Sequence, residues 1–180
     1  MQYQFKLRAL YVSLGVVAFF ILYWTGTQIK LDYNSSIKLK EQFMQKIEGL
    51  NYIGIFANNL TISIIMFTPG IGILFGLFSG YSTGTVFSAI AQTSQATTEQ
   101  ISPLVILLTP FGIMEIFCYG LAISRSSLLL ISLIKKDNVP KQLKYTLIEV
   151  MIAVVILFFA ALIEWHFISI FDPTLLNSNE

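Results

Sequence analysis

Long apolar runs alternate with short polar stretches along nearly the whole chain. A helix needs about 20 apolar residues to cross a bilayer, because the hydrocarbon core is about 30 Å thick and a helix rises about 1.5 Å per residue. Dividing the runs at their polar and helix-breaking residues predicts five membrane segments. Their expected ranges are residues 8–29, 52–67, 71–91, 103–127 and 145–170.

One break separates the second segment from the third. Residues 52–91 carry no Lys, Arg, Asp or Glu, and as a single helix they would be about 60 Å long, twice the hydrocarbon core. Pro69 and Gly70 are the expected breakers, since proline cannot continue a helix and glycine permits a tight turn. The segment before them is short, so it either spans a thin part of the membrane or re-enters on one side.

The fourth apolar run, residues 103–134, is too long to cross the membrane untilted. Pro110 together with Gly112 is the expected helix break in this run, where the helix can kink. Alternatively, the span ends near residues 124–127, and residues 128–134 form a short interfacial helix.

The most polar stretch, residues 30–51, mixes isolated apolar side chains with lysine and glutamate. This spacing suits an amphipathic helix on the membrane surface over residues 36–50, and a solvated loop is the alternative.

The lysines and arginines of the short loops predict the orientation, because they are enriched on the cytoplasmic side. With the N-terminus inside, the inner face holds six of them and the outer face four, which favours this orientation weakly. The inner set is Lys6, Arg8, Lys135, Lys136, Lys141 and Lys144, and the outer set is Lys30, Lys38, Lys40 and Lys46.

The composition supports a membrane protein of the all-α class. Hydrophobic residues make up 55% and charged residues 12%, half the roughly 25% typical of soluble domains. We therefore expect one polytopic transmembrane helical bundle over residues 1–180, in the cell membrane. A net charge of +1 offers no basic field for nucleic acid. One cysteine, Cys118, and one histidine, His166, cannot form a self-contained zinc or haem site, so no cofactor is expected. No motif typical of a catalytic site occurs, which favours a protein that is not an enzyme.

Small residues recur at every fourth position in the third segment. Gly72, Gly76, Gly80 and Gly84 form one nearly straight stripe on a helix, and Ser88 continues it. Association in lipid depends on close backbone approach, which small residues allow. The stripe therefore predicts a helix-packing interface, within the chain or with a partner; a channel-lining helix is the alternative.

Glu115 lies inside the fourth apolar run. A carboxylate at membrane depth costs a few kcal/mol, so it should face protein and have a polar partner. Asn58, Asn59 and Tyr119 are candidates, and Arg125 is one only if the helix breaks between the two residues. The expected buried polar network is either a structural anchor or a relay for protons or ions.

Near the end of the fifth segment, Glu164 and His166 flank Trp165. Tryptophan is enriched at the membrane–water interface, so we expect all three side chains to lie there. A metal-ligand role for the glutamate and the histidine is the less favoured alternative.

Two stretches resemble the stage II sporulation protein M family. One is Ile-Phe-Ala-Asn-Asn-Leu at residues 55–60, which runs on into the glycine series. The other is Leu-Thr-Pro-Phe-Gly-Ile-Met-Glu at residues 108–115, where the family typically shows Pro-His-Gly-Ile-x-Glu. Its proline, glycine, isoleucine and glutamate match, whereas Phe111 replaces the histidine. The resemblance covers residues 52–133.

This resemblance implies a non-catalytic membrane component, since the namesake of the family is a polytopic scaffold in a membrane complex. The expected partners are the lipid bilayer and either other membrane protein subunits or a second copy of the chain. Two alternatives remain. One is a small carrier or channel that uses Glu115, Asn58 and Asn59 around a broken helix. The other is an accessory subunit of a membrane-bound enzyme whose cofactors sit in other chains.

Overall fold

The computed structural model describes residues 2–93, 103–136 and 139–171, and all the regular structure in them is α-helical. The all-α prediction is therefore confirmed for the described part of the chain. The helices are α1 (Gln2–Thr27), α2 (Tyr33–Ile47), α3 (Tyr52–Met66), α4 (Ile71–Thr93), α5 (Pro103–Leu107), α6 (Pro110–Lys135) and α7 (Val139–Phe171).

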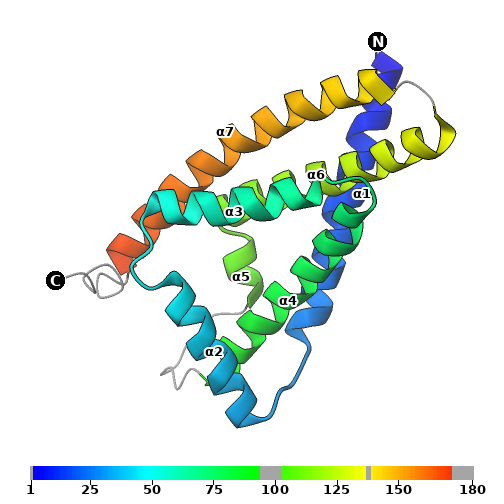
Figure 1. Ribbon diagram of the computed structural model, residues 1–180. Helices are drawn as coiled ribbons and strands as arrows, with labels where there is room; N and C mark the ends of the chain where they lie inside the picture. Colours follow the sequence, from blue (N-terminus) through cyan, green and yellow to red (C-terminus); the bar gives the residue numbers. More distant parts are fainter. Residues whose placement is uncertain (1, 94–102, 137–138, 172–180) are drawn as a thin grey trace.

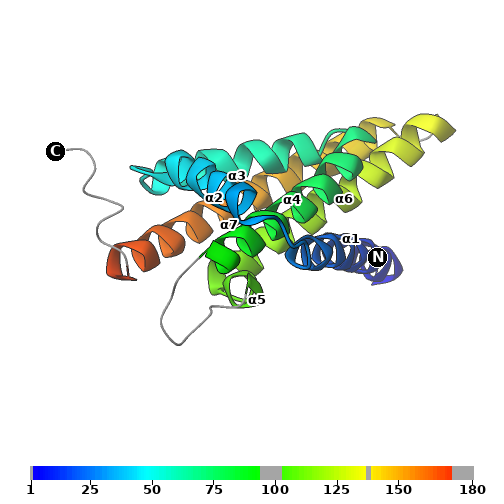
Figure 2. The ribbon, with the colours of Figure 1, turned by 90° about the horizontal axis from the view of Figure 1, so that it is seen from below.

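The long helices form two groups that meet at one end of the molecule. Helices α1 and α4 lie side by side, and α3, α6 and α7 form the other group (Figure 1). The groups converge where α1 begins, α6 ends and α7 begins. Figure 2 shows α1 and α3 on opposite sides of the molecule, with α4 between them. The end where the groups converge carries all six basic residues assigned to the inner face, and we call it the basic end.

Four described helices are long and apolar enough to cross a membrane. They are Lys6–Thr27, Ile71–Thr93, Pro110–Lys135 and Val139–Ile170. Helices α2 and α3 pass the same test only as a pair, and the chain bends by 115° between them. The described residues therefore hold four candidate spans, or five with the bent pair, in agreement with the expected number of about five.

Helix α6 occupies the centre of the bundle. Its most apolar stretch is 67% buried, against 22–28% for the other three candidate spans. Helices α1, α3, α4 and α7 all contact it. Although its composition is similar to that of the other candidate spans, α6 is thus the one that is mostly enclosed by protein.

The structure has the expected helix break at Pro110, and the break is complete: a new helix begins there, so the helix is not merely kinked. Helix α5 ends before Thr109, and α6 starts at Pro110, whose missing N–H is not needed at the first helical position. The Thr109 hydroxyl accepts a hydrogen bond from the Gly112 N–H at 3.1 Å, which caps the new helix. Gly112 therefore lies in the first turn of α6. The helix also continues to Lys135, past the expected end of this segment at residue 127, so that end is wrong.

Other helix ends differ from the expected ones in less consequential ways. Helix α7 begins at Val139 instead of residue 145, because Pro140 is tolerated in a first turn. The expected breakers Pro69 and Gly70 do lie in the turn between α3 and α4, where Gly70 has φ +76°. Such a conformation favours glycine, since it has no Cβ to clash.

The polar stretch after α1 is helical, so the loop alternative is wrong. Asp32 caps α2 by accepting a hydrogen bond from the Ser35 N–H at 3.0 Å, and the helix therefore begins earlier than residue 36. Helix α2 packs on α4, with the rings of Phe43 and Phe87 6.0 Å apart. One face is thus covered by protein.

Candidate functional site

A chain of polar side chains links α3 to the first part of α6. Glu115 lies five positions after the first residue of α6, just past the capped break. Asn59 of α3 donates a hydrogen bond from Nδ2 to Glu115 Oε1 at 2.5 Å. Asn58 in turn donates from Nδ2 to Asn59 Oδ1 at 3.1 Å. The structure therefore brings together both asparagines and the glutamate of the predicted polar network.

Helix α7 adds a second carboxyl group, which sequence reasoning assigned to the membrane interface. The Glu164 carboxyl group faces that of Glu115, and the two interact electrostatically. Its Oε2 atom is enclosed, and no hydrogen-bond donor of the described residues reaches it. Glu164 lies one turn after Ala160 and Ala161 and two turns after Leu157, all buried, so it continues the inner face of α7. We call Glu115 and Glu164 the carboxyl pair.

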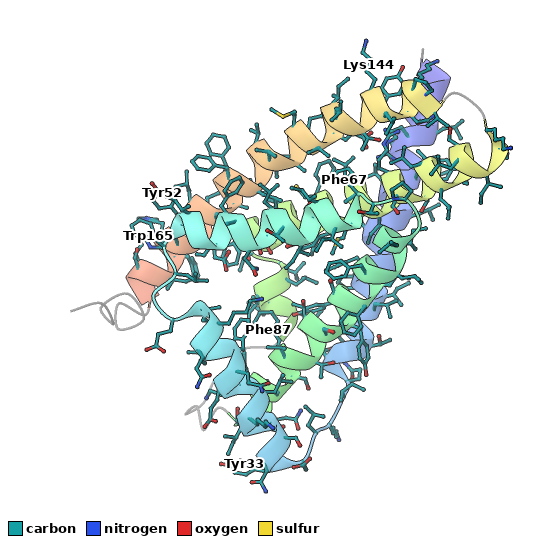
Figure 3. The ribbon with its side chains drawn as sticks, in the orientation of Figure 1. Tyr33, Tyr52, Phe67, Phe87, Lys144 and Trp165 are labelled. Carbon is teal, nitrogen blue, oxygen red and sulfur yellow. The ribbon has the colours of Figure 1, made fainter. Side chains whose placement is uncertain are left out.

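The aromatic residues and the histidine that neighbour the carboxyl pair in sequence lie in different surroundings. Tyr119 lies one turn after Glu115, is buried, and packs on Phe19 of α1 with ring centroids 5.3 Å apart. Trp165 packs on Tyr52 of α3 at 5.9 Å, near the end of the molecule opposite the basic end (Figure 3). His166 is exposed. Of Glu164, Trp165 and His166, only Glu164 therefore joins the polar interior.

Arg125 belongs to a different cluster, so its assignment to the Glu115 network is wrong. It forms a bidentate pair with Glu149 of α7, through Nε to Oε2 at 2.8 Å and through Nη2 to Oε1. Arg8 of α1 binds the same carboxylate, from Nε to Oε1 at 2.7 Å and from Nη2 to Oε2 at 2.5 Å. The helix break that could have let Arg125 reach Glu115 lies before Glu115, not between them. We call these residues the Arg–Glu–Arg triad.

The Arg–Glu–Arg triad is enclosed and has further hydrogen bonds. The side chain of Arg125 is 4% exposed and that of Arg8 20%. Arg8 Nη1 donates to Ser124 Oγ at 2.9 Å, and Arg125 Nη1 donates to Gln142 Oε1 at 2.9 Å. The triad thus joins α1, α6 and α7 near the basic end.

Sequence reasoning did not find the triad, although a signal for it existed. Glu149 lies in the apolar run of α7, and it is the only acidic residue between Val139 and Ile163. An intramembrane carboxylate and an intramembrane guanidinium normally pair with one another. Arg125 therefore pointed to Glu149 as much as to Glu115, and Arg8 was counted with the loop residues.

The small-residue series on α4 is buried inside the bundle. Gly80 and Gly84 lie against main-chain atoms of α1, so a Cβ at either position would overlap a carbonyl oxygen or come into tight contact with one. Ser88 donates a hydrogen bond to the Ile29 carbonyl oxygen just after α1, at 2.8 Å. These three residues bring α4 close to α1.

The other two glycines of the series face different neighbours. Gly72 lies against the carbonyl group of Met66 at the end of α3. Gly76 lies against the side chain of Ile123 on α6. One stripe therefore contacts three helices within the same chain.

The family model of stage II sporulation protein M matches residues 9–168. The chain belongs to the stage II sporulation protein M family. The resemblance stated from the two short motifs is thus confirmed, and the chain is a multi-pass membrane protein. No curated protein and no solved structure matches the chain. In this member of the family, the motif glutamate is Glu115 of the carboxyl pair. Phe111, at the usual histidine position, packs on Phe167 of α7 at 6.0 Å.

Proposed function

We propose that this protein is a non-catalytic subunit or scaffold of a multiprotein complex in the cell membrane. One observation carries the proposal: five charged side chains that the described helices enclose form two clusters, one joining α3, α6 and α7 and the other joining α1, α6 and α7. These side chains are Arg8, Glu115, Arg125, Glu149 and Glu164. Charges used in this way fix helices relative to one another.

A fixed bundle suits a protein that positions others. The carboxylate of Glu149 receives hydrogen bonds from two arginines on two different helices. Moving α6 relative to α7 would separate Arg125 from Glu149 and leave Arg125 as an unpaired buried charge, which is strongly unfavourable. The outer faces of α1 and α7 are exposed and apolar, and they offer large surfaces to lipid and to partner proteins within the membrane.

The test is purification of the tagged protein from its native membrane in a mild detergent, followed by native gel analysis and mass spectrometry. We expect a stoichiometric complex with other membrane proteins. A Glu115→Gln variant should still assemble, because an amide keeps an acceptor for Asn59. Recovery of the chain alone, as a monomer or dimer, would contradict the proposal.

A second function is favoured by the carboxyl pair itself, namely proton or small-cation transport. Two carboxyl groups in contact cannot both remain ionised at low energetic cost. A proton held between them would supply the donor that the enclosed Oε2 atom of Glu164 lacks. The adjacent break between α5 and α6 resembles the discontinuous helices around which transporters build ion sites.

Liposomes separate these two functions. The purified protein is reconstituted with a pH-sensitive dye inside, and a pH gradient or cation gradient is imposed. Transport predicts a flux that Glu164→Gln and Glu115→Gln each abolish, while Glu41→Gln on the exposed face of α2 leaves it unchanged. Absence of flux, with an intact complex in the native membrane, supports the scaffold.

A further inference from the structure

The outer face of α7 has a shallow apolar hollow near the basic end. Its volume is about 550 Å³, and it is bordered entirely by aliphatic and methionine side chains. The lining residues are Leu147, Ile148, Met151, Ile152, Val155 and Ile156. Five of the six are exposed large hydrophobic residues, so the hollow opens away from the bundle.

The length of the hollow matches one leaflet of a bilayer. Leu147 and Ile156 are nine residues apart, or about 14 Å along a helix. Half of the hydrocarbon core is about 15 Å thick. The acyl chain of a lipid extends through one leaflet, so it fits a hollow of this length. A second helix that crossed α7 at an angle could contact a stretch of the same length, so the charge at the end of the hollow decides between the two occupants.

Positive charge lies at the end of the hollow nearest the membrane surface. Lys144 is exposed and lies three and four residues before Leu147 and Ile148, so it shares their stripe on α7. Lys141 lies about one turn further out and is also exposed. Figure 3 shows Lys144 pointing away from the bundle from the first turns of α7.

The interior behind these lysines does not neutralise them. The Arg–Glu–Arg triad contains two guanidinium groups and one carboxylate, a net charge of 2 − 1 = +1. Glu149 is buried on the other side of α7 and already binds both arginines. The potential at this end of α7 is therefore positive and suits an anionic headgroup.

We propose that the basic end of α7 binds an anionic glycerophospholipid, with its phosphate at Lys141 and Lys144 and one acyl chain in the hollow. The lipid would cover the hollow within a single leaflet. This site is independent of whether the protein acts as a scaffold or as a carrier.

Native mass spectrometry of the purified protein tests the site with phosphatidylglycerol and phosphatidylcholine of identical acyl chains. We expect phosphatidylglycerol to be retained preferentially by the wild-type protein. The Lys141→Gln/Lys144→Gln variant should lose affinity for it by about 5-fold per lysine. The control, Lys38→Gln/Lys46→Gln, removes the same charge from the exposed face of α2 and should retain the preference.

A second variant tests the hollow separately from the charge. Met151→Trp fills part of the hollow and leaves both lysines in place, so it should lower phosphatidylglycerol binding without a change in thermal stability. Unchanged binding in both the lysine and the Met151 variants would overturn the proposal. A lipid-free dimer that Met151→Trp dissociates would also overturn it, because a second copy would then occupy the face.

Discussion

The substitution Glu149→Gln should be among the most destabilising single changes in this protein. The glutamate carboxylate accepts hydrogen bonds from both arginines of the Arg–Glu–Arg triad, including contacts of 2.7 Å from Arg8 and 2.8 Å from Arg125. Glutamine has nearly the same shape, but it carries no charge, and its NH2 group would face guanidinium donors. The change therefore leaves two positive charges without their partner.

The magnitude follows from the burial of Arg125. Its side chain is 4% exposed, so water cannot replace the lost carboxylate. Removing one partner of a buried ion pair typically costs about 3–5 kcal/mol. A protein whose total stability is about 5–15 kcal/mol loses a large share of it. At about 2–4 °C per kcal/mol for a chain of this size, the melting temperature should fall by about 6–20 °C.

Thermal unfolding of the purified protein in detergent or nanodiscs measures this loss. Glu41→Gln is the matched control, since it removes the same charge from an exposed position on α2 and should change the melting temperature little. A loss below about 1 kcal/mol for Glu149→Gln would show that the triad is solvated or otherwise compensated, contrary to its burial.

Replacing the whole triad provides a further check. In the triple variant Arg8→Met, Arg125→Met, Glu149→Leu, no buried charge remains to be paired. Substituting a complete buried ion network by apolar side chains is often neutral or stabilising. The triple variant should therefore recover most of the stability that Glu149→Gln loses. If it is as unstable as the single variant, packing rather than charge explains the effect.

Three further predictions follow from other parts of the fold. Gly84→Leu should destabilise the bundle by about 1–3 kcal/mol or more in thermal unfolding, because its side chain meets the α1 backbone, whereas Phe78→Leu on an exposed face should not. The second prediction concerns Asp32, the residue that caps α2. Hydrogen bonds from the Ser35 side chain and N–H hold the pKa of the Asp32 carboxyl group below its usual range. The ionised carboxylate therefore stabilises the start of α2 above that range, and this stabilisation is lost as the pH falls through the lowered pKa. Asp32→Ala removes the cap, so it should speed hydrogen exchange in the first turn of α2. The third prediction concerns topology: α2 and the end of α6 lie at opposite ends of the molecule (Figure 1). In a variant without Cys118, single cysteines at positions 38 and 135 should therefore react with an impermeant maleimide from opposite sides of the membrane. Labelling from the same side would refute this topology.

The helices were largely predictable from the sequence, because each depends on a local pattern. Apolar runs of spanning length gave α1, α4 and α7, and Pro69 with Gly70 placed the turn between α3 and α4. The glycine spacing on α4 likewise singled out one face of one helix, and the structure buries that face. Periodicity and helix breakers act within a few residues, so one sequence suffices to interpret them.

The sequence showed which charged residues lie in apolar runs, but it did not decide which of them pair, because pairing depends on which helices meet. Glu115 lies 49 positions before Glu164, and Arg8 lies 141 positions before Glu149. No local pattern encodes these separations. The break at Pro110 was expected, but its completeness was not: Pro110 alone is compatible with a kink, whereas the Thr109 cap starts a new helix.

The two charged clusters determine how α6 and α7 are aligned. These helices run in opposite directions, and each contributes a charged side chain to both clusters: Glu115 and Arg125 from α6, Glu164 and Glu149 from α7. Apolar side chains specify such an alignment poorly in a membrane, because lipid is as apolar as they are. Sliding α7 along α6 by one turn, about 5.4 Å, would separate both pairs at once. The polar contacts of the interior therefore account for the register of a bundle whose surfaces are almost uniformly hydrophobic.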